Sequence, residues 1–357
     1  MPADTTYQEE LKQRRTLKLR GLVDKLPRLC RQYFIGIEPT TSVMTRIAYA
    51  YDLGIFFNYL HDYNEYFKQK KLRDISINDL ERVSSDDIEL FLEYLNLYTR
   101  SDTNNPDVSY EYSNNNKGKA RKLSSIRSLY KYFYKRHKIK VDPSLFVETP
   151  KIKQKPIIRL EVDEVANLLD TVESGDKLTD TQLRYQKYTR LRDLAILTLF
   201  LGTGIRVSEL VGINISDIDF KINGFKITRK GGNQVILYFS DEVKNTLIEY
   251  LKDRNKIRTI SGHEDALFIS LQRKRISVRT VENLVKKYTR IVTNLKNISP
   301  HKLRSTYGTN LYRETGDIYL VADVLGHKDV NTTKKHYAAI DDEKRRMAAK
   351  VVKLRED

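Results

Sequence analysis

Cysteine is nearly absent from the sequence, since Cys30 is the only one in 357 residues. An intrachain disulfide is therefore impossible, which favours a reducing compartment such as the cytoplasm. The N-terminal stretch MPADTTYQEELKQRR lacks the apolar core of a signal peptide. The most apolar stretch, residues 194–205, is too short to cross a bilayer and contains Gly202 and Gly204. We expect a cytoplasmic protein without a membrane span.

Motifs for metal and nucleotide binding are also missing. The sequence contains no cluster of carboxylates, no paired cysteines and no HExxH motif, which are the usual marks of a metal site. The segment RKGGN at residues 229–233 has glycines and a lysine, but it lacks the spacing of a phosphate-binding loop. The sequence therefore predicts neither a metal ion nor any other cofactor.

Positive charge is what the sequence has in excess. Lys and Arg number 64 against 47 Asp and Glu, which gives a formal net charge of +17 and a pI near 9.5. Such a chain is attracted to polyanions, of which nucleic acid and anionic membrane are the two candidates. No segment alternates cationic and apolar faces as a membrane-surface helix does. We therefore expect nucleic acid as the partner.

Helical periodicity dominates the first 150 residues. Apolar residues recur at helical spacing in three segments, residues 40–67, 88–95 and 123–137. Residues 100–119 are polar and rich in Asn, which indicates a long loop. We expect residues 1–150 to form an all-helical domain, followed by a basic linker near Pro150 and Pro156.

Helical segments continue beyond the linker. Residues 160–169 follow a helical pattern, and residues 191–201 are dense in Leu, Ile and Ala as in a buried helix. Between them, residues 173–190 are predicted to be a polar excursion. Helical patterns return after Val278 and continue to the end of the chain.

A small sheet interrupts these helices. Residues 224–228 and 234–239 alternate like two strands, and the glycines between them favour a tight hairpin. The predicted fold class is therefore mainly α. An all-helical first domain precedes a mixed α+β domain with a small antiparallel sheet at residues 151–340 and a tail helix at residues 341–357.

A set of basic residues and one tyrosine stands out in the second half. The set consists of Arg206, Lys230, His301, Arg304, His327 and Tyr337. Phosphoryl transfer without a metal requires cations for the phosphate charge, an acid for the leaving oxygen and a nucleophile, and this set supplies all three. Each member alone has an ordinary explanation as a solvated charge, a helix cap or one of 23 tyrosines. The combination carries the hypothesis.

The motifs around these residues resemble those of the tyrosine recombinase (phage integrase) family. TGIRVSEL, RKGG, HKLR, VLGHKDVNTT and the final HYA occur in the order of the family and near its spacing. The resemblance covers the whole second domain, and the first half is similar to the family's core-binding domain. Within the family the chain resembles the Xer recombinases that resolve chromosome dimers. The insertion before Arg190 and the RKGG hairpin resemble the single-recombinase type of streptococci.

The resemblance implies a catalytic DNA domain that cuts and joins strands without metal or ATP. Tyr337 would attack a DNA phosphate and form a 3′-phosphotyrosyl link. Arg206 and Arg304 would clamp the non-bridging oxygens, because a guanidinium matches their geometry. Lys230 would protonate the departing 5′ oxygen.

Supporting roles follow from the same resemblance. His301 would accept the tyrosine proton or donate to the phosphate, and His327 would donate to the phosphate. Glu209, one turn after Arg206, would orient the basic cluster, although it also fits an ordinary carboxylate at a helix start. The segment from His327 to Tyr337 is one residue longer than is usual in the family. Tyr312, the alternative nucleophile, fits the family's order poorly.

DNA contacts outside the active site are expected at two basic helix starts. The residues are Lys119, Arg121, Lys122 and Arg127 in the first domain and Arg273, Lys274, Arg275 and Arg279 in the second. Such side chains would hold phosphates and fix the register. Solvated helix starts are the alternative explanation.

The resemblance also implies partners. These are double-stranded DNA, three further copies in a homotetramer on two DNA sites, and a DNA translocase of the division septum. Residues 341–357 would enter a neighbouring protomer or fold back on their own domain. Resolution of chromosome dimers at a dif-like site is the expected role. The alternatives are a mobile-element integrase or excisionase, a type IB topoisomerase and a DNA-binding regulator without catalysis.

Overall fold

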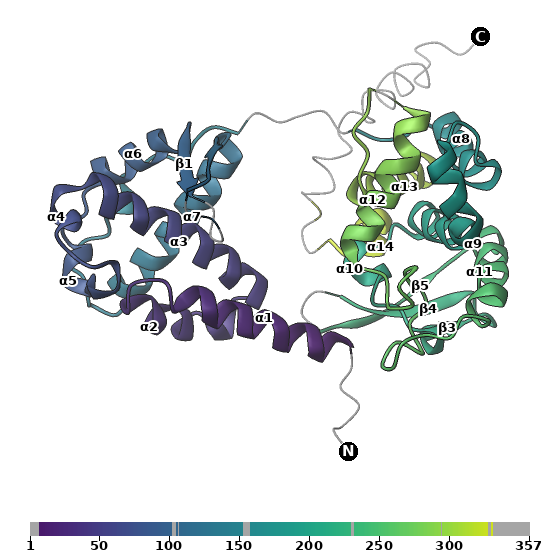
Figure 1. The fold of residues 1–357 in the computed structure, drawn as a ribbon, viewed down its shortest axis with the longest axis horizontal. Coiled ribbons are helices and arrows are strands. Elements are labelled where there is room, and N and C mark those ends of the chain that lie inside the picture. Colours follow the sequence, from purple (N-terminus) through teal and green to yellow (C-terminus); the bar gives the residue numbers. More distant parts are fainter. Residues whose placement is uncertain are drawn as a thin grey trace, which may run out of the picture. The chain divides into compact units, whose positions relative to one another are not determined.

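The computed structural model describes residues 7–101, 105, 107–152, 158–229, 232–293, 295–327 and 330. The chain divides into two compact units, residues 1–154 and 155–357, both drawn in Figure 1. Each unit has a large apolar core of its own. The predicted class, mainly helical with a small antiparallel sheet, is confirmed.

Helices build most of the first unit. Its elements are α1 (Tyr7–Val23), α2 (Leu29–Gly36), α3 (Val43–Tyr63), α4 (Glu65–Lys68), α5 (Ile77–Leu80), α6 (Ser85–Tyr94), β1 (Tyr98–Ser101), β2 (Ser109–Tyr112) and α7 (Asn116–Tyr134). Phe56 and Phe57 of α3 and Tyr130 and Phe133 of α7 are completely buried. Burial of such aromatic side chains contributes about 1.5–3 kcal/mol each, so these two helices anchor the unit.

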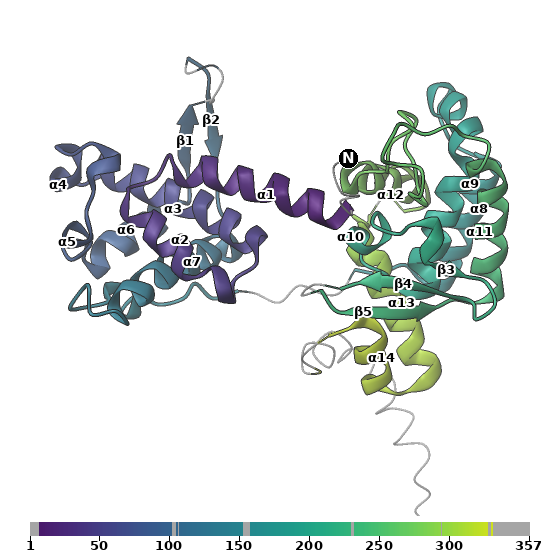
Figure 2. The same cartoon turned by 90° about the horizontal axis from the view of Figure 1, so that it is seen from below.

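A β-hairpin stands where the sequence predicts a loop, so the first unit is not all-helical. Strands β1 and β2 pair antiparallel from Tyr98 opposite Tyr112 to Ser101 opposite Ser109. The rings of Tyr98 and Tyr112 stack with centroids 5.7 Å apart, and cross-strand aromatic pairs of this kind stabilise a hairpin. Figure 2 shows the hairpin projecting from the helices of its unit. Few of its side chains are buried, which explains why its sequence lacks the pattern of a core strand.

The second unit packs helices around a small sheet. Its elements are α8 (Val162–Ser174), α9 (Asp180–Thr203), α10 (Val207–Leu210), β3 (Ile218–Asp219), β4 (Gly224–Thr228), β5 (Gln234–Tyr238), α11 (Asp241–Arg254), α12 (Val278–Val292), α13 (Pro300–Thr315) and α14 (Ile318–Leu325). The strands form one antiparallel sheet in the order β3-β4-β5. Strands β4 and β5 fall where the sequence predicts them, and Phe225, Ile227 and Leu237 face the core.

Helix α9 begins far earlier than the sequence predicts, so residues 173–190 are not a mere polar excursion. Thr179 and Gln182 form a capping box, in which each side chain accepts a hydrogen bond from the backbone of the other. Gln186 is buried and donates through Nε2 to the carbonyl of Val172 at 3.0 Å. A pattern of apolar residues does not detect a buried residue that is polar. The sequence analysis therefore does not predict the first turns of α9.

Helices α13 and α14 lead to the segment that holds His327. Gly316 ends α13 with a φ of 69°, and Asp317 caps α14 by accepting from the backbone N–H groups of Tyr319 and Leu320. Gly326, with a φ of 60°, ends α14 after eight residues. A helix this short is unstable alone. Its position therefore depends on packing against the rest of the unit, such as that of Val321 and Leu325 on Tyr312. None of the helices in the described segments is long and apolar enough for a membrane crossing.

Candidate active site

Arg206 lies at the junction of α9 and α10. Gly204 ends α9 in the left-handed region with a φ of 61°, and Arg206 is the residue before α10. The backbone N–H and Nη1 of Arg206 donate to the two carboxylate oxygens of Glu209 at 3.0 and 2.8 Å. Because Glu209 is only 7% exposed, this ion pair fixes the orientation of the guanidinium. The structure thus pairs Glu209 with the cation that the sequence analysis expects it to orient.

Arg304 comes from the first turns of α13 and is 5% exposed. Its Nη1 donates to the carbonyl oxygen of Gly204 at 2.5 Å, and its Nη2 donates to that of Leu325. A buried charge is costly unless it is hydrogen-bonded. The backbone carbonyls at the ends of α9 and α14 supply the acceptors, because they have no partners within their own helices.

The end of α14 joins these two arginines. Nη2 of Arg206 donates to the carbonyls of Leu325 and Gly326, both at 3.1 Å. The carbonyl of Leu325 therefore accepts from Arg206 and from Arg304. Two predicted site residues that are far apart in the sequence meet on one peptide group.

The two histidines of the predicted set are close in sequence to residues of this cluster. His327 follows Gly326, and its backbone N–H donates to the carbonyl of Ala322 at 2.9 Å. His301 lies in the first turn of α13, three residues before Arg304, and its side chain is exposed. Lys230 and Tyr337 lie outside the described residues.

Arg229 is a neighbour of the cluster that the sequence analysis does not single out. It directly precedes Lys230, and its Nη2 donates to the carbonyl of Val324 at 2.8 Å. The end of α14 is therefore contacted by a third guanidinium. The only available signal was its position within the RKGG motif, because a bond to a backbone carbonyl leaves no trace in the sequence.

Two tyrosines of α13 pack close to the cluster. Tyr312 is 7% exposed and belongs to a small apolar cluster with Val321 and Leu325. Tyr307 lies beside Gly204, and burial raises the pKa of its hydroxyl. Tyr312 packs within this apolar cluster, so the geometry gives no support to it as a nucleophile.

Gly204 is predicted to be hard to replace. A β-carbon there would clash with the ring of Tyr307 and lie 2.9 Å from Cδ2 of Leu325. We expect Gly204→Ala to lower the free energy of unfolding by about 2–5 kcal/mol, since the left-handed backbone costs about 1–2 kcal/mol and overpacking about 1–3 kcal/mol. Urea unfolding measures the loss. Gly232→Ala is the control, because Gly232 has a φ of 89° but no atom within 4 Å of an added β-carbon. Equal losses in both variants would contradict the packing explanation.

Lys122 does not lie at the surface, which corrects its assignment as a DNA contact. The residue is 3% exposed, and its Nζ donates to Oδ1 of Asn114 at 2.7 Å and lies 4.0 Å from Oδ1 of Asp52. Burial lowers the pKa of the Lys122 ammonium and raises that of the Asp52 carboxyl. Arg121 remains exposed and donates to Asp52 at 2.5 Å. Lys122 thus contacts Asn114 and Asp52 in the interior of the first unit and not the solvent.

Two further predicted DNA contacts hold their own unit together. The guanidinium of Arg127 donates to the carbonyls of Ser144 and Val147 and to the hydroxyl of Thr149. That of Arg275 donates to the carbonyls of Val211 and Ile213 and to Oδ1 of Asn214. These bonds occupy most of the guanidinium donors, so both arginines fix loops in this structure.

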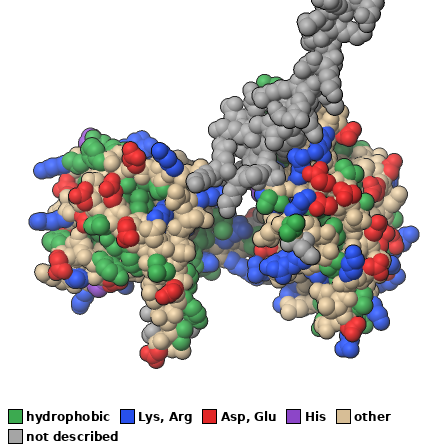
Figure 3. All heavy atoms as spheres, turned by 90° about the horizontal axis from the view of Figure 1, so that it is seen from above, with side chains coloured by type: hydrophobic (Ala, Val, Ile, Leu, Met, Phe, Trp, Pro, Cys, Tyr) green, Lys and Arg blue, Asp and Glu red, His purple; other side chains and the backbone are tan. Residues whose placement is uncertain are grey.

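The remaining predicted contacts are at least partly accessible. Arg273, Lys274 and Arg279 are exposed, and the partly exposed Lys119 donates to Asn96 at 2.6 Å. Figure 3 shows Lys and Arg side chains interspersed with Asp and Glu on the displayed faces of both units.

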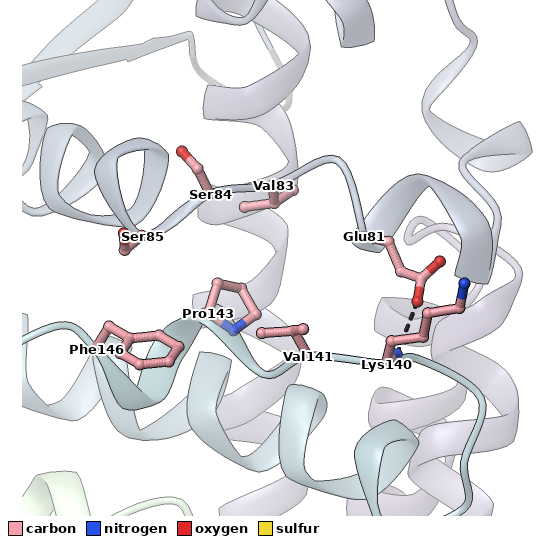
Figure 4. Close-up of a pocket in the computed structure, with 8 residues that line it drawn as sticks. All are labelled: Glu81, Val83, Ser84, Ser85, Lys140, Val141, Pro143 and Phe146. Atoms are coloured by element: carbon pink, nitrogen blue, oxygen red, sulfur yellow. Dashed lines mark hydrogen bonds between the residues drawn. The ribbon is translucent and has the colours of Figure 1, made fainter.

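A pocket of about 460 Å³ lies in the first unit between the start of α6 and the segment after α7. Figure 4 shows its lining residues, among them Val83, Val141 and Phe146. Its carboxylate, Glu81, accepts a hydrogen bond from the backbone of Lys140 at 2.7 Å. The pocket is mainly apolar and contains none of the predicted catalytic residues.

The family model of the phage integrase family matches residues 159–344. The tyrosine recombinase XerC of Caldanaerobacter subterraneus subsp. tengcongensis is 35% identical over 328 residues, which cover 88% of this chain and 83% of the relative. The tyrosine recombinase XerS of Streptococcus pneumoniae is 29% identical over 354 residues, covering 90% of this chain and 96% of the relative.

A solved structure shares the fold. The XerH site-specific recombinase bound to a palindromic difH substrate matches with a TM-score of 0.61 and 16% identity, over 83% of this chain and 76% of that one. The expected resemblance to Xer recombinases, the streptococcal single-recombinase type included, is confirmed. The chain belongs to the phage integrase family and is a tyrosine-type site-specific recombinase, an enzyme that cuts and rejoins DNA.

Proposed function

We propose that this recombinase breaks and reseals DNA through a covalent 3′-phosphotyrosyl intermediate on Tyr337. The observation that carries the proposal is the meeting of Arg206 and Arg304 on one carbonyl group, with Glu209 paired to Arg206. Two guanidinium groups held this close match the non-bridging oxygens of a single phosphate. Charge that develops on the pentacoordinate phosphate is stabilised by such preorganised donors.

The reaction exchanges one phosphoester for another. The phenol oxygen of Tyr337 attacks the phosphorus in line, the bond from phosphorus to the 5′ oxygen breaks, and the 3′ phosphate stays on the tyrosine. His301 accepts the phenol proton, and Lys230 donates a proton to the leaving 5′ oxygen. His327 donates to a phosphate oxygen. A 5′-hydroxyl of a partner duplex then attacks the phosphotyrosine and reverses the steps, so no energy source is consumed.

The biological role we propose is resolution of chromosome dimers at a dif-like site. Similarity to the XerC and XerS recombinases over most of the chain supports this role, as does the likeness in fold to a recombinase bound to a difH substrate. The active assembly is a homotetramer on two sites, in which residues 341–357, outside the described segments, dock on a neighbouring protomer. A DNA translocase of the division septum acts as its partner.

A mobile-element integrase or excisionase is the second candidate, since it would use the same site. Recombination between two copies of a terminus-proximal dif-like sequence on one plasmid separates the two roles. Efficient deletion between those copies is expected for a chromosomal recombinase. Activity restricted to the ends of an element would favour the integrase.

Covalent capture tests the proposed chemistry. A nicked suicide duplex loses a short fragment after cleavage, which prevents religation and traps the protein on DNA. We expect a species on a denaturing gel that carries both the 5′-labelled strand fragment and the protein. A chain that binds the duplex but never forms this species would be a regulator without catalysis.

Replacing Lys230 is predicted to have an effect that depends on the leaving group. We expect Lys230→Ala to slow cleavage of ordinary DNA by about 100- to 10,000-fold, the usual contribution of a general acid. Cleavage of DNA with a sulfur in the 5′-bridging position should be affected much less, because a thiolate leaves without a proton. Single-turnover cleavage of both substrates measures the two rates, and equal losses would remove Lys230 from the acid role.

A further inference from the structure

Arg229 links the β4–β5 hairpin to another part of the second unit. Its backbone N–H donates to the carbonyl of Asn233 at 2.8 Å, and its carbonyl accepts from Gly232 at 3.1 Å. Its guanidinium leaves the hairpin and donates to α14, through Nη2 to the carbonyl of Val324 at 2.8 Å and through Nη1 to that of Asp323 at 3.4 Å. The backbone of this residue thus closes the turn, while its side chain attaches the turn to a helix end.

Arg229 completes a series of arginines on successive carbonyls at residues 323–326. The first two carbonyls accept from Arg229, the third from Arg206 and Arg304, and the fourth from Arg206. The last carbonyls of a helix have no N–H partner in a following turn and carry the negative end of its dipole, so cations are favoured there. The base of the hairpin and both arginines therefore take their positions from the same helix end.

Gly326 leaves room for this arrangement. A β-carbon at Gly326 would clash with Nη1 and Cζ of Arg229, and the residue adopts a φ of 60°. The glycine therefore serves two purposes, since it ends α14 and admits the side chain of Arg229. The backbone at Gly326 and the side chain of Arg229 thus both fit the contact between the hairpin and α14.

We propose that Arg229 is a positioning residue that sets Lys230 relative to Arg206 and Arg304. Lys230 is the next residue in the chain, and a peptide bond holds successive Cα atoms at a fixed separation. Because Arg229 is anchored on α14, the chain enters Lys230 from a fixed point, and we expect the ammonium of Lys230 to act on the leaving oxygen from there. The inference rests on the proposed function of Lys230 as the general acid.

The experiment compares two leaving groups in the full chain. We expect Arg229→Ala to slow single-turnover cleavage of ordinary suicide DNA by about 10- to 100-fold, less than the loss of the acid itself. Cleavage of the 5′-bridging sulfur substrate should fall by less than about threefold, because that leaving group needs no proton. A partly unfolded variant would lose both rates in the same proportion, so the ratio of the two rates reports positioning and not stability.

Three variants complete the design. Lys226→Ala removes another cation of the same hairpin, whose Nζ lies 3.7 Å from Oδ1 of Asp217. This control should leave the ratio of the cleavage rates on the two substrates unchanged. Arg229→Lys keeps the charge without the fork of donors and should recover part of the rate on ordinary DNA. Equal losses on both substrates in Arg229→Ala, or no loss on either, would overturn the inference. If Lys230→Ala itself shows equal losses, the proposed acid fails, which is a separate result.

Discussion

We expect Tyr337→Phe to abolish the covalent protein–DNA species while the affinity for DNA stays unchanged. The substitution removes the attacking oxygen and keeps the ring, so only the nucleophile is lost. We expect binding to persist, because the proposed DNA contacts come from basic side chains and not from the phenol. A suicide duplex analysed on a denaturing gel measures the adduct, and a gel-shift titration at fixed salt measures binding.

Tyr312→Phe provides the matched control. Tyr312 lies on α13 and is 7% exposed, and the same single oxygen is removed from a ring close to the arginine cluster. We expect this variant to form the adduct at the rate of the unaltered protein. An adduct that persisted in Tyr337→Phe and vanished in Tyr312→Phe would reassign the nucleophile.

Arg304→Lys is the second substitution with a large expected effect. An ammonium group cannot donate to two acceptors in the fixed fork of a guanidinium, and loss of one preorganised donor to a developing anion costs about 100- to 1,000-fold in rate. The buried carbonyls of Gly204 and Leu325 also lose hydrogen bonds from Arg304. We expect this loss to lower the free energy of unfolding by about 1–3 kcal/mol. Single-turnover cleavage and urea unfolding measure the two effects.

Arg254→Lys separates the chemistry from the stability. Arg254 is 3% exposed, and its guanidinium donates to the carbonyls of Ala266 and Glu264. It is therefore a buried arginine on backbone acceptors, like Arg304, but it has no place in the proposed reaction. We expect Arg254→Lys to lower the free energy of unfolding and to leave the cleavage rate per folded molecule unchanged. A full cleavage rate in Arg304→Lys would contradict the phosphate clamp.

The sequence predicts the members of the candidate site better than their contacts. TGIRVSEL and HKLR point to Arg206 and Arg304, because side chains at motif positions can be compared with a family. Their shared acceptor, the carbonyl of Leu325, has no side-chain signature and becomes visible only in three dimensions. Arg229 is missed for the same reason.

Surface position is equally hard to predict from a run of charges. Lys122 stands in a basic segment with Lys119 and Arg121, yet it is buried against Asn114 while Arg121 is exposed. A helix turns each successive residue to a different face, and a run of like charges hides which face is covered. Sequence periodicity places the helix but does not separate the buried cation from its neighbours.

The fold follows a similar rule. Strands β4 and β5 alternate and are predicted correctly, because one face of each meets the core. The hairpin of β1 and β2 is largely exposed, and the rings of its paired tyrosines stack on each other. Its sequence therefore lacks the alternation of polar and apolar residues that predicts a strand on a core. The early start of α9 depends on a capping box and a buried glutamine, which are interactions of polar groups.

The use of carbonyl acceptors at the end of α14 has a consequence for mutational tolerance. A backbone carbonyl is present whatever side chain its residue carries, so the bonds to Val324 and Leu325 do not depend on those side chains. Laboratory evolution could therefore vary Asp323 and Val324, both at least partly exposed, while the arginine contacts persist. Gly326 is the exception, because an added side chain there meets Arg229. Libraries that keep Gly326 fixed and randomise the two positions are expected to retain most of their active members.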